Sequence, residues 1–347
     1  MPINIDGSKG IPQNTTETTQ IPVGTTAQRP ANPAAGLIRF NTDRGLIEWY
    51  DPITDIWSSV AFDVAVVATG GTVTDIEQDG KKFRVHTFTS DGTFDVTRGG
   101  EVEHLVVGGG GAGGNFWGGG GGGGGVIMGL DNLSPQTYSI VVGAGGLQSS
   151  TEDGTADNKV AGGDGVNSSA FNFTAIGGGG GGGDDSKSGR SGGSGGGGGG
   201  GGDGGLRTPG QGNNGGNSIT SAWVSNGIGG GGGGGSQPGF DSDTVNSQSA
   251  KGGGGISSFI TGSSVFYAGG GGGGNSNGGD EGNYEDRNAG LPGLGGGGRG
   301  QNRSRISTRP NESGAPNTGG GGGGSDTRFM PASFGGSGIV IVRYRIG

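Results

Sequence analysis

Two histidines and their neighbouring carboxylates are the residues that could carry out acid–base chemistry. His86 and His104 are the only imidazoles among the 347 residues, and Glu101 and Glu103 adjoin the second one. A histidine–carboxylate pair can act as a general base or acid. Both histidines, however, lie in runs of apolar and β-branched residues that are typical of strands, which favours packing or hydrogen bonding. We therefore expect no catalytic residue and no enzyme activity.

Acidic residues could also supply oxygen ligands to a calcium ion. The candidate pairs are Asp51 with Asp55, Asp184 with Asp185, and Asp241 with Asp243. None has the ligand spacing of an EF-hand loop, so solvated loop carboxylates are the simpler interpretation. Cysteine is absent, which excludes disulfides, a thiolate nucleophile and zinc held by sulfur. We expect no metal site and no cofactor.

Aromatic and arginine side chains in the polar connections could contact a receptor. An aromatic ring with little apolar company can stack on a sugar or form an interface hot spot. Arginines can bind anionic surface sugars, pair with acids on a neighbouring subunit, or bind RNA as in arginine–glycine segments. The receptor-contact candidates are Trp223, Phe240, Tyr284, Arg299, Arg303 and Arg305. Phe116-Trp117, in a tight turn between glycine stretches, is expected to plug the end of the glycine region.

The overall charge argues against a nucleic-acid partner. The chain has 30 acidic and 21 basic residues, a net charge of −9 and an isoelectric point near 4.7. Nucleic-acid binding usually requires a basic surface that displaces phosphate counterions. Gly-x-Gly-x-x-Gly recurs throughout, but a dinucleotide site needs it between a strand and a helix, and helix signals are almost absent.

Glycine is the dominant residue, at 98 of 347, while hydrophobic residues make up only 27%. This composition excludes one large apolar core spread over the whole chain, and the solid glycine runs exclude collagen. Nine blocks hold four or more consecutive glycines: 108–111, 118–125, 177–183, 195–202, 229–235, 252–255, 269–274, 295–298 and 319–324. Flexible linkers are one interpretation.

The arrangement of the blocks favours a second interpretation, a bundle of polyglycine II helices. The blocks recur, several have similar lengths, and they directly abut strand-like runs. A polyglycine II helix has three residues per turn and no internal hydrogen bonds, so its amides and carbonyls must bond to neighbouring helices. Only glycine permits that close approach. Because ordering glycine is costly, the bundle needs a frame that fixes its ends.

Strand-like runs between the blocks could supply this frame. They are rich in Val, Ile, Phe and Thr with period-two stretches, as half-buried strands require. The expected strands are Phe62–Ala68, Lys82–Thr89, Thr93–Val96, Glu101–Val107, Thr137–Val142, Ala170–Ile176, Ser257–Tyr267 and Gly338–Arg345. The sequence therefore predicts an all-β chain in which residues 62–347 form a β-sandwich framing a bundle of polyglycine II helices.

The first 61 residues divide into two parts. Residues 1–26 are polar and lack apolar periodicity, which predicts an extended attachment segment that orders only against a partner. Residues 27–61 predict a small β-hairpin module with strands at 37–40 and 46–50. An isolated hairpin cannot bury Trp49, Tyr50 and Trp57, so we expect these three residues to mediate oligomerisation or attachment.

Several stretches of the sequence resemble a known family. The segments 83–96 and 102–108, with 263–269 and 335–344, resemble the glycine-rich domain of bacteriophage tail-fibre and adhesin proteins. A similar domain occurs with a jelly-roll-like sandwich in certain receptor-kinase ectodomains. Residues 26–42 and 48–50 look like a short β-module common near the start of phage fibres.

The resemblance implies a virion component of the phage tail with a jelly-roll-like sandwich. It further implies a homotrimer that attaches through its N-terminus to other tail or baseplate proteins. Its distal loops would touch host polysaccharide or an outer-membrane protein. Because a long shaft is missing, a short fibre or adhesin tip is expected. A head fibre or capsid decoration protein, and a glycine-rich RNA-binding protein, remain as alternatives.

Overall fold

Alternating β-branched and polar residues form strands between the glycine blocks. The computed structural model describes residues 21–60, 65–148, 160–184, 188–219, 227–243, 250–275, 289–301, 312–325 and 333–346. These residues fall into two compact units, Met1–Val64 and Ala65–Gly347. Apart from one short 3-10 turn, η1 (Thr26–Gln28), all regular elements of the described residues are strands. The predicted all-β class is confirmed, and the described residues contain no helix with the length and hydrophobicity that a membrane crossing requires.

The first unit is a four-stranded sheet in the order β1-β2-β3-β4. Its strands are β1 (Val23–Gly24), β2 (Ile38–Asn41), β3 (Leu46–Asp51) and β4 (Ile56–Val60). β2 and β3 form the expected hairpin. β1 lies within the expected attachment segment 1–26, yet it pairs in parallel with β2. The sheet of the first unit therefore includes Val23 and Gly24, because their backbone pairs with β2; residues 1–20 of the expected segment lie outside the described residues.

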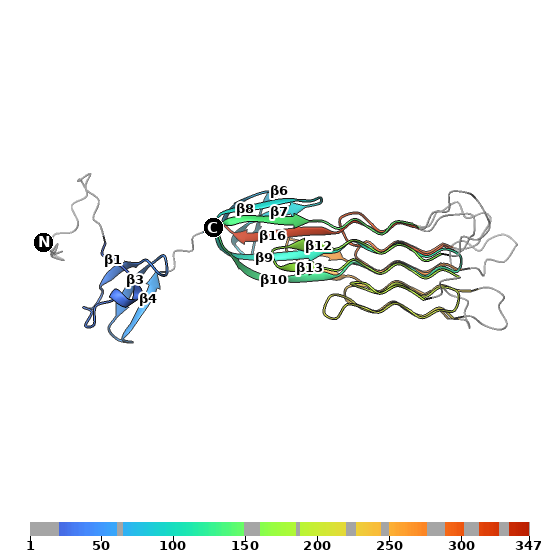
Figure 1. The fold of residues 1–347 in the computed structure, drawn as a ribbon, viewed down its shortest axis with the longest axis horizontal. Helices are drawn as coiled ribbons and strands as arrows, with labels where there is room; N and C mark the ends of the chain where they lie inside the picture. Colours follow the sequence, from blue (N-terminus) through green and yellow to red (C-terminus); the bar gives the residue numbers. More distant parts are fainter. Residues whose placement is uncertain are drawn as a thin grey trace. The chain divides into compact units, whose positions relative to one another are not determined.

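The second unit contains a sandwich of two five-stranded antiparallel sheets (Figure 1). The first sheet has the order β10 (Val126–Leu133), β9 (Gly100–Val107), β16 (Ile339–Arg345), β7 (Lys81–Phe88) and β6 (Thr72–Gln78). The second has the order β13 (Phe173–Ala175), β12 (Ser168–Ala170), β11 (Gln136–Val141), β8 (Gly92–Arg98) and β5 (Val67–Thr69). The C-terminal strand β16 thus lies in the middle of the first sheet.

Apolar side chains fill both faces of the first sheet. Phe94, Val106 and Val342 belong to a core between the two sheets. On the opposite face, Leu105 and Ile341 pack under a hairpin formed by β14 (Ile256–Ser258) and β15 (Val265–Tyr267). Burial on both faces explains why β16 begins with an uninterrupted apolar run, Ile339-Val340-Ile341-Val342, instead of alternating with polar residues.

Several strands differ from the expected ones in extent. The runs expected at 170–176 and 257–267 each contain a turn: the first forms the β12–β13 hairpin and the second the β14–β15 hairpin. Two strands of the second unit were not expected at all. β6 is an edge strand with mostly polar residues, and β10 contains Gly129 and Asp131, which weaken its strand signal. Residues 62–64 of the first expected strand, Phe62–Ala68, lie outside the described residues.

Glycine segments extend from the ends of the sandwich strands (Figure 1). β9 runs directly into 108–115, and 118–125 returns directly into β10. The ladder between these strands continues into the glycine region, because the Gly108 amide donates to the Gly125 carbonyl at 2.9 Å. The sandwich therefore fixes one end of the glycine segments and sets the register of the first pair.

Candidate functional site

The glycine segment 118–125 shows the hydrogen-bond geometry of a polyglycine II helix. Every third amide, beginning with Gly118, donates to segment 319–325, with N···O distances of 2.8–3.0 Å. The next set of amides donates to 176–182, and the third set donates to 229–235. This three-residue period is the one that a polyglycine II helix requires.

The carbonyls of 118–125 complete a hexagonal arrangement. They accept amides from three other segments, 108–114, 194–197 and 271–274. The six surrounding segments also bond to one another in a closed ring: 108–115, 176–183, 192–198, 228–235, 268–275 and 319–325. The segment 118–125 is thus the central helix of a seven-helix bundle. We call these seven segments the inner helices.

Close backbone packing explains why the inner helices consist almost wholly of glycine. A Cβ atom built on Gly121 would overlap the carbonyl oxygen of Gly111. The same overlap with a neighbouring carbonyl occurs at Gly119, Gly120 and Gly124. Because the obstructing atoms belong to hydrogen-bonded backbone, they cannot move aside as a side chain could. Glycine at these positions is a packing requirement, not a source of flexibility.

Outer segments surround the inner helices and carry side chains. These segments are 143–147, 160–166, 188–191, 203–206, 213–217, 239–242, 250–255, 290–294, 295–301, 312–315 and 333–338. Two of the three four-glycine blocks, 252–255 and 295–298, belong to this outer layer, whereas 108–111 belongs to an inner helix. Exposed apolar side chains project from it, which the sequence analysis did not single out: Leu147, Val160, Val166, Leu206, Leu291, Leu294 and Phe334.

The end of the bundle far from the sandwich anchors several connections. Segment 108–115 leaves β9 and ends at the Phe116-Trp117 turn, so this turn lies at the far end. Gly118, which follows the turn, donates to Ser325 at 3.0 Å and accepts from Gly274 at 2.8 Å. Ile228 bridges both Ile219 and Asn275. Residues 219, 228, 275 and 325, from distant parts of the chain, therefore converge at this end.

A family model described as a glycine-rich domain matches residues 87–345, more than half of the chain. The chain belongs to this glycine-rich domain family. No curated protein matches the sequence. The family match spans β8 to β16 together with the inner helices, so the glycine-rich domain comprises both the bundle and most of the sandwich that frames it.

Two of the six receptor-contact candidates, Phe240 and Arg299, lie among the described residues. Phe240 is half-exposed on the outer segment 239–242, where its backbone amide donates to Lys251 at 3.0 Å. Arg299 is partly buried on the outer segment 295–301. Trp223, Tyr284, Arg303 and Arg305 lie outside the described residues. Their connections, 220–226, 276–288 and 302–311, begin at residues 219, 275 and 301, which lie at the far end of the bundle.

Phe116 and Trp117 lie where we expected them to close the glycine region. Their rings stack with centroids 4.7 Å apart, and both residues have a positive φ, 50° and 56°. Gly227 lies against the indole of Trp117, where an added Cβ would come within 2.7 Å of the ring. The stacked rings therefore cap the central pair of glycine segments.

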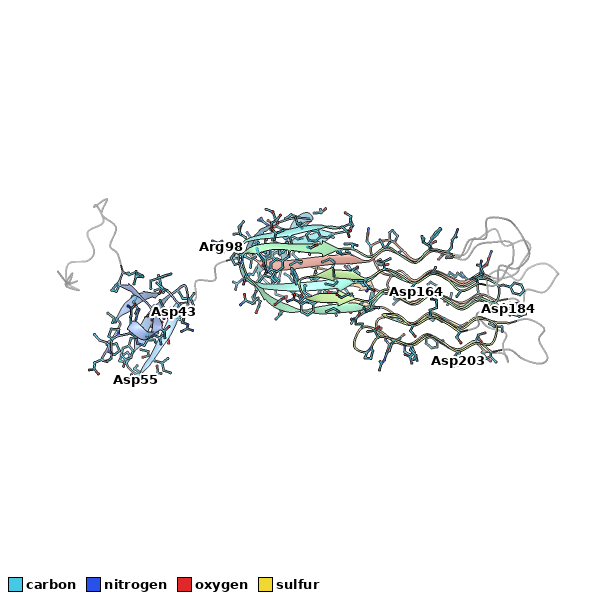
Figure 2. The ribbon with its side chains drawn as sticks, viewed as in Figure 1. Asp43, Asp55, Arg98, Asp164, Asp184 and Asp203 are labelled. Carbon is cyan, nitrogen blue, oxygen red and sulfur yellow. The ribbon has the colours of Figure 1, made fainter. Side chains whose placement is uncertain are left out.

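Carboxylates on the bundle are dispersed. Figure 2 shows Asp164, Asp184 and Asp203 at separate positions on the glycine region. Asp164 pairs with Arg190 across two outer segments at 2.7 Å. Asp241 accepts the Asn217 amide at 2.6 Å, and Asp185 lies outside the described residues. Within the described part of the chain, no three His, Asp or Glu residues gather in a way that could hold a metal ion.

Both histidines are buried in the sandwich. His86 Nδ1 lies 2.7 Å from the Gly70 carbonyl, and its Nε2 lies 3.1 Å from the Tyr344 hydroxyl. His104 stacks on Phe173 at 4.5 Å, and neither of its ring nitrogens has a hydrogen-bond partner among the described residues. Burial lowers the pKa of both imidazoles. Both imidazoles pack in the core, and neither forms a hydrogen bond to a carboxylate within the described part of the chain.

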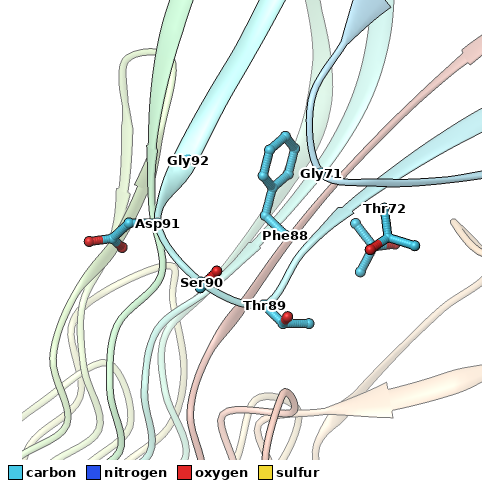
Figure 3. Close-up of a pocket in the computed structure, with 8 residues that line it drawn as sticks. Gly71, Thr72, Phe88, Thr89, Ser90, Asp91 and Gly92 are labelled. Carbon is cyan, nitrogen blue, oxygen red and sulfur yellow. The ribbon is translucent and has the colours of Figure 1, made fainter.

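One small open hollow of about 150 Å³ lies beside the β7–β8 turn (Figure 3). Its lining residues are Gly71, Thr72, Thr87, Phe88, Thr89, Ser90, Asp91 and Gly92. Asp91 is the only ionisable residue among them, and its Oδ1 accepts the Val142 amide at 2.8 Å. The hollow offers hydroxyl groups but no pair of titratable groups, so we assign no chemistry to it.

The first unit separates the three aromatic residues that we expected to act together. Side chains alternate along a strand, so Trp49 lies on one face of the sheet and Tyr50 on the other. Tyr50 is paired with Trp57, and their rings are 5.7 Å apart. Strand alternation is visible in the sequence and could have separated Trp49 from the other two.

A buried ionic cluster covers the face that holds Trp57. Glu48 is fully buried and accepts hydrogen bonds from Arg29 at 2.6 and 3.1 Å and from Asn41 at 3.0 Å. The hydrogen bonds from Arg29 and then Asn41 lower the pKa of Glu48, against the opposing effect of burial. The guanidinium carbons of Arg29 and Arg39 lie 5.7 and 5.9 Å from the Trp57 ring centroid.

Proposed function

We propose that this protein is a non-enzymatic virion component, a phage tail fibre or adhesin that presents loops for host cell-surface recognition. The observation that carries the proposal is the seven-helix bundle. The residues at its far end include those from which three connections of the chain begin. Residues 219, 275 and 301 begin the connections that contain Trp223, Tyr284, Arg303 and Arg305.

The bundle suits the task of holding such connections in fixed positions. Each inner helix bonds to its neighbours along its length, so the separations between helix ends are set by the lattice. Changes in the sequence of a connection leave the helices that anchor it unaltered. Aromatic and arginine side chains in those connections can stack on sugar rings and bind anionic groups. Several copies of the protein on one virion would add avidity without strong individual contacts.

The proposed partners follow from this role. The host ligand is a surface polysaccharide or an outer-membrane protein, and the N-terminal unit attaches to other tail or baseplate proteins. We further propose a homotrimer as the assembled form. No cofactor takes part, because adhesion requires only binding.

Two alternatives make different demands. A head fibre or capsid decoration protein would use the same fold and differ only in the virion part that receives its N-terminus. A glycine-rich RNA-binding protein would be largely disordered before binding, whereas the glycine amides here are bonded to neighbouring backbone. The acidic net charge of −9 also disfavours RNA.

A cell-binding assay tests the proposed function directly. The fluorescently labelled full chain is incubated with a panel of bacterial strains, and with their purified lipopolysaccharides and capsules. We expect saturable binding to a subset of strains and loss of that binding in Trp223→Ala and Tyr284→Ala. Phe266→Ala is the matched control, since this exposed aromatic residue lies on β15, in the hairpin that packs against the first sheet.

Two further measurements separate the alternatives. Equal binding of all variants to the bacterial strains would show that the connections containing Trp223 and Tyr284 do not contact the host. A gel-shift assay with single-stranded RNA tests the RNA alternative, for which we expect no shift at physiological salt. Electron microscopy of virions with the labelled protein distinguishes a tail position from a head position.

A further inference from the structure

The outer segments continue the hexagonal arrangement of the inner helices. The outer segment 239–242, for example, accepts the Gly231 amide of the inner helix 228–235 at 3.0 Å and also bonds to both of its outer neighbours, 213–217 and 250–255. Four other inner helices are covered in the same way, each by one outer segment: 108–115 by 143–147, 192–198 by 203–206, 268–275 by 290–294, and 319–325 by 312–315.

The remaining helix of the ring, 176–183, is covered differently. Its outer neighbours are 160–166 and 188–191, and among the described residues no segment lies between these two and bonds to both. We call this place in the lattice the unfilled position. The amides of Gly177 and Gly180, one helical turn apart, are directed toward it, because the amides between and after them donate to neighbouring inner helices.

Two side chains supply the acceptors that an outer segment supplies elsewhere. The Gly177 amide donates to Asn167 Oδ1, and the Gly180 amide donates to Asp164 Oδ1, both at 2.9 Å. In the inner helix 228–235, the equivalent amides donate to backbone carbonyls at 2.9 and 3.0 Å. Asp164 and Asn167 are themselves three residues apart, so their spacing matches one turn of the glycine helix that they cover.

An ion pair joins the two sides of the unfilled position. Asp164 Oδ2, on 160–166, lies 2.7 Å from Arg190 Nη2, on 188–191. The side chains of Asp164 and Arg190 are 37% and 53% exposed, whereas Gly177 and Gly180 beneath them are buried. The ion pair therefore has solvent on its outer side and glycine backbone on its inner side, as an outer segment would.

We infer that Asp164, Asn167 and Arg190 take the place of an outer glycine segment and prevent another segment from adding at the unfilled position. A row of unpaired amides at the spacing of one helical turn would be a template for further glycine backbone, as an edge strand is for another strand. Charged side chains protect such edges, because an incoming chain must displace them and bury their charge. The inference concerns how the lattice ends at its surface and is independent of host binding.

Hydrogen–deuterium exchange of the unaltered full chain, followed by nuclear magnetic resonance, gives the first test. The Gly254 amide serves as the reference, because it has no acceptor among the described residues. We expect the amides of Gly177 and Gly180 to exchange orders of magnitude more slowly than the Gly254 amide. Exchange at the rate of Gly254 would mean that the two side chains do not replace a segment, which overturns the inference.

Two variants of Asp164 separate its role as an acceptor from its charge. Asp164→Ala removes the acceptor, whereas Asp164→Asn loses the charge and keeps an oxygen that can accept the Gly180 amide. We expect exchange at Gly180 to rise about tenfold or more in Asp164→Ala and to stay near the wild-type rate in Asp164→Asn. The Gly181 amide, which donates to Ala112 at 2.9 Å, should be unaffected in both. Equal exchange at Gly180 in the two variants, or equal acceleration at Gly181, overturns the inference.

Light scattering over a range of protein concentrations tests the protective role. The double variant Asp164→Ala/Asn167→Ala leaves both outward amides without their acceptors, so we expect it to associate beyond the wild-type mass as its concentration rises. Asp203→Ala is the control and should behave as wild type, because it removes an exposed carboxylate from another outer segment. Circular dichroism checks the fold, and Asp164→Ala alone replaces the double variant if the latter is unfolded. A folded variant that keeps the wild-type mass while its outward amides exchange rapidly refutes the protective role.

Discussion

Glycine at the residue scale acts through the space that it leaves for neighbouring backbone. At Gly121, an added methyl group would enter the space of the Gly111 carbonyl. At Gly254 in the outer layer, the nearest atom is the side-chain Oε1 of Gln237, 3.1 Å away, and this side chain can move. Two glycines in similar runs of sequence therefore have different tolerance for alanine.

We predict that Gly121→Ala lowers the free energy of unfolding by at least the ~1–3 kcal/mol typical of an overpacked core. Gly254→Ala should be near neutral, because only a flexible side chain must shift. Differential scanning calorimetry of the two variants and the wild type measures the difference. Comparable losses of stability in both variants would mean that the inner and outer segments do not differ in packing.

His104 makes stability depend on pH. Its ring lies among Phe171 and Phe173, and the nearest charges, Asp131 and Glu103, only partly offset the effect of burial, which lowers its pKa. In the unfolded chain the imidazole takes up a proton near pH 6.5, while in the folded chain it stays neutral. Stability is therefore constant above about pH 6.5 and falls as the pH drops below that value.

We predict that this loss approaches about 1.4 kcal/mol per pH unit for each histidine until the folded-state pKa is reached. His86, whose pKa burial also lowers, adds to it. His104→Phe should remove the contribution of His104 to the pH dependence of stability. The substitution should cost little stability, because the His104 ring nitrogens have no hydrogen-bond partner among the described residues. Denaturant unfolding at pH 7.5 and pH 5.5 measures the slope; an unchanged slope in His104→Phe contradicts the assignment.

At the scale of elements, β16 links distant parts of the sequence, because this last strand of the second unit pairs with two of its early strands. It lies between β9 and β7, and its first four residues are buried on both faces of the sheet. In segment 333–338, which precedes it, the Gly336 carbonyl accepts the Gly110 amide at 2.9 Å, and the Gly338 amide donates to the Gly143 carbonyl at 2.9 Å. The first sheet consequently remains incomplete until the last residues of the chain are in place.

Deletion of residues 339–347 should therefore prevent folding of the whole second unit, because β9 and β7 would lose their common partner. Limited proteolysis of the purified variant should cleave throughout the glycine segments, whereas the wild type should resist. A chain that lacks residues 1–64 is the control and should keep the resistant core, since those residues form a separate compact unit. A protease-resistant C-terminal deletion would show that β16 is dispensable.

At the scale of the whole molecule, the glycine lattice determines how stable the domain is to local opening. Amides of 118–125 are buried and bonded to carbonyls on three neighbouring helices. The Gly254 amide, in the outer layer, has no acceptor among the described residues. Exchange with solvent requires a hydrogen bond to open, so the two sites should exchange at very different rates.

We predict that the amides of 118–125 exchange with deuterium orders of magnitude more slowly than an unfolded peptide, and that Gly254 exchanges rapidly. Hydrogen–deuterium exchange followed by nuclear magnetic resonance resolves the two classes. Rapid exchange throughout 118–125 would mean that the glycine blocks are flexible spacers, and the display function proposed for the bundle would then lose its basis.

The sequence alone determined the local structure, since local structure depends on neighbouring residues. Alternation of Val, Ile and Thr predicted most strands, and solid glycine runs predicted helices that pack through backbone. Only the tertiary structure decided which runs are inner helices and which, such as 252–255, are outer ones. Because glycine has no side chain, a glycine run does not itself specify which segments it packs against. The strands that fix the helix ends determine that packing. The N-terminal sheet shows an intermediate case. Strand alternation separates Trp49 from Tyr50, but the buried ionic cluster around Glu48 required contacts of Arg29 and Asn41 with β3 that no local pattern encodes.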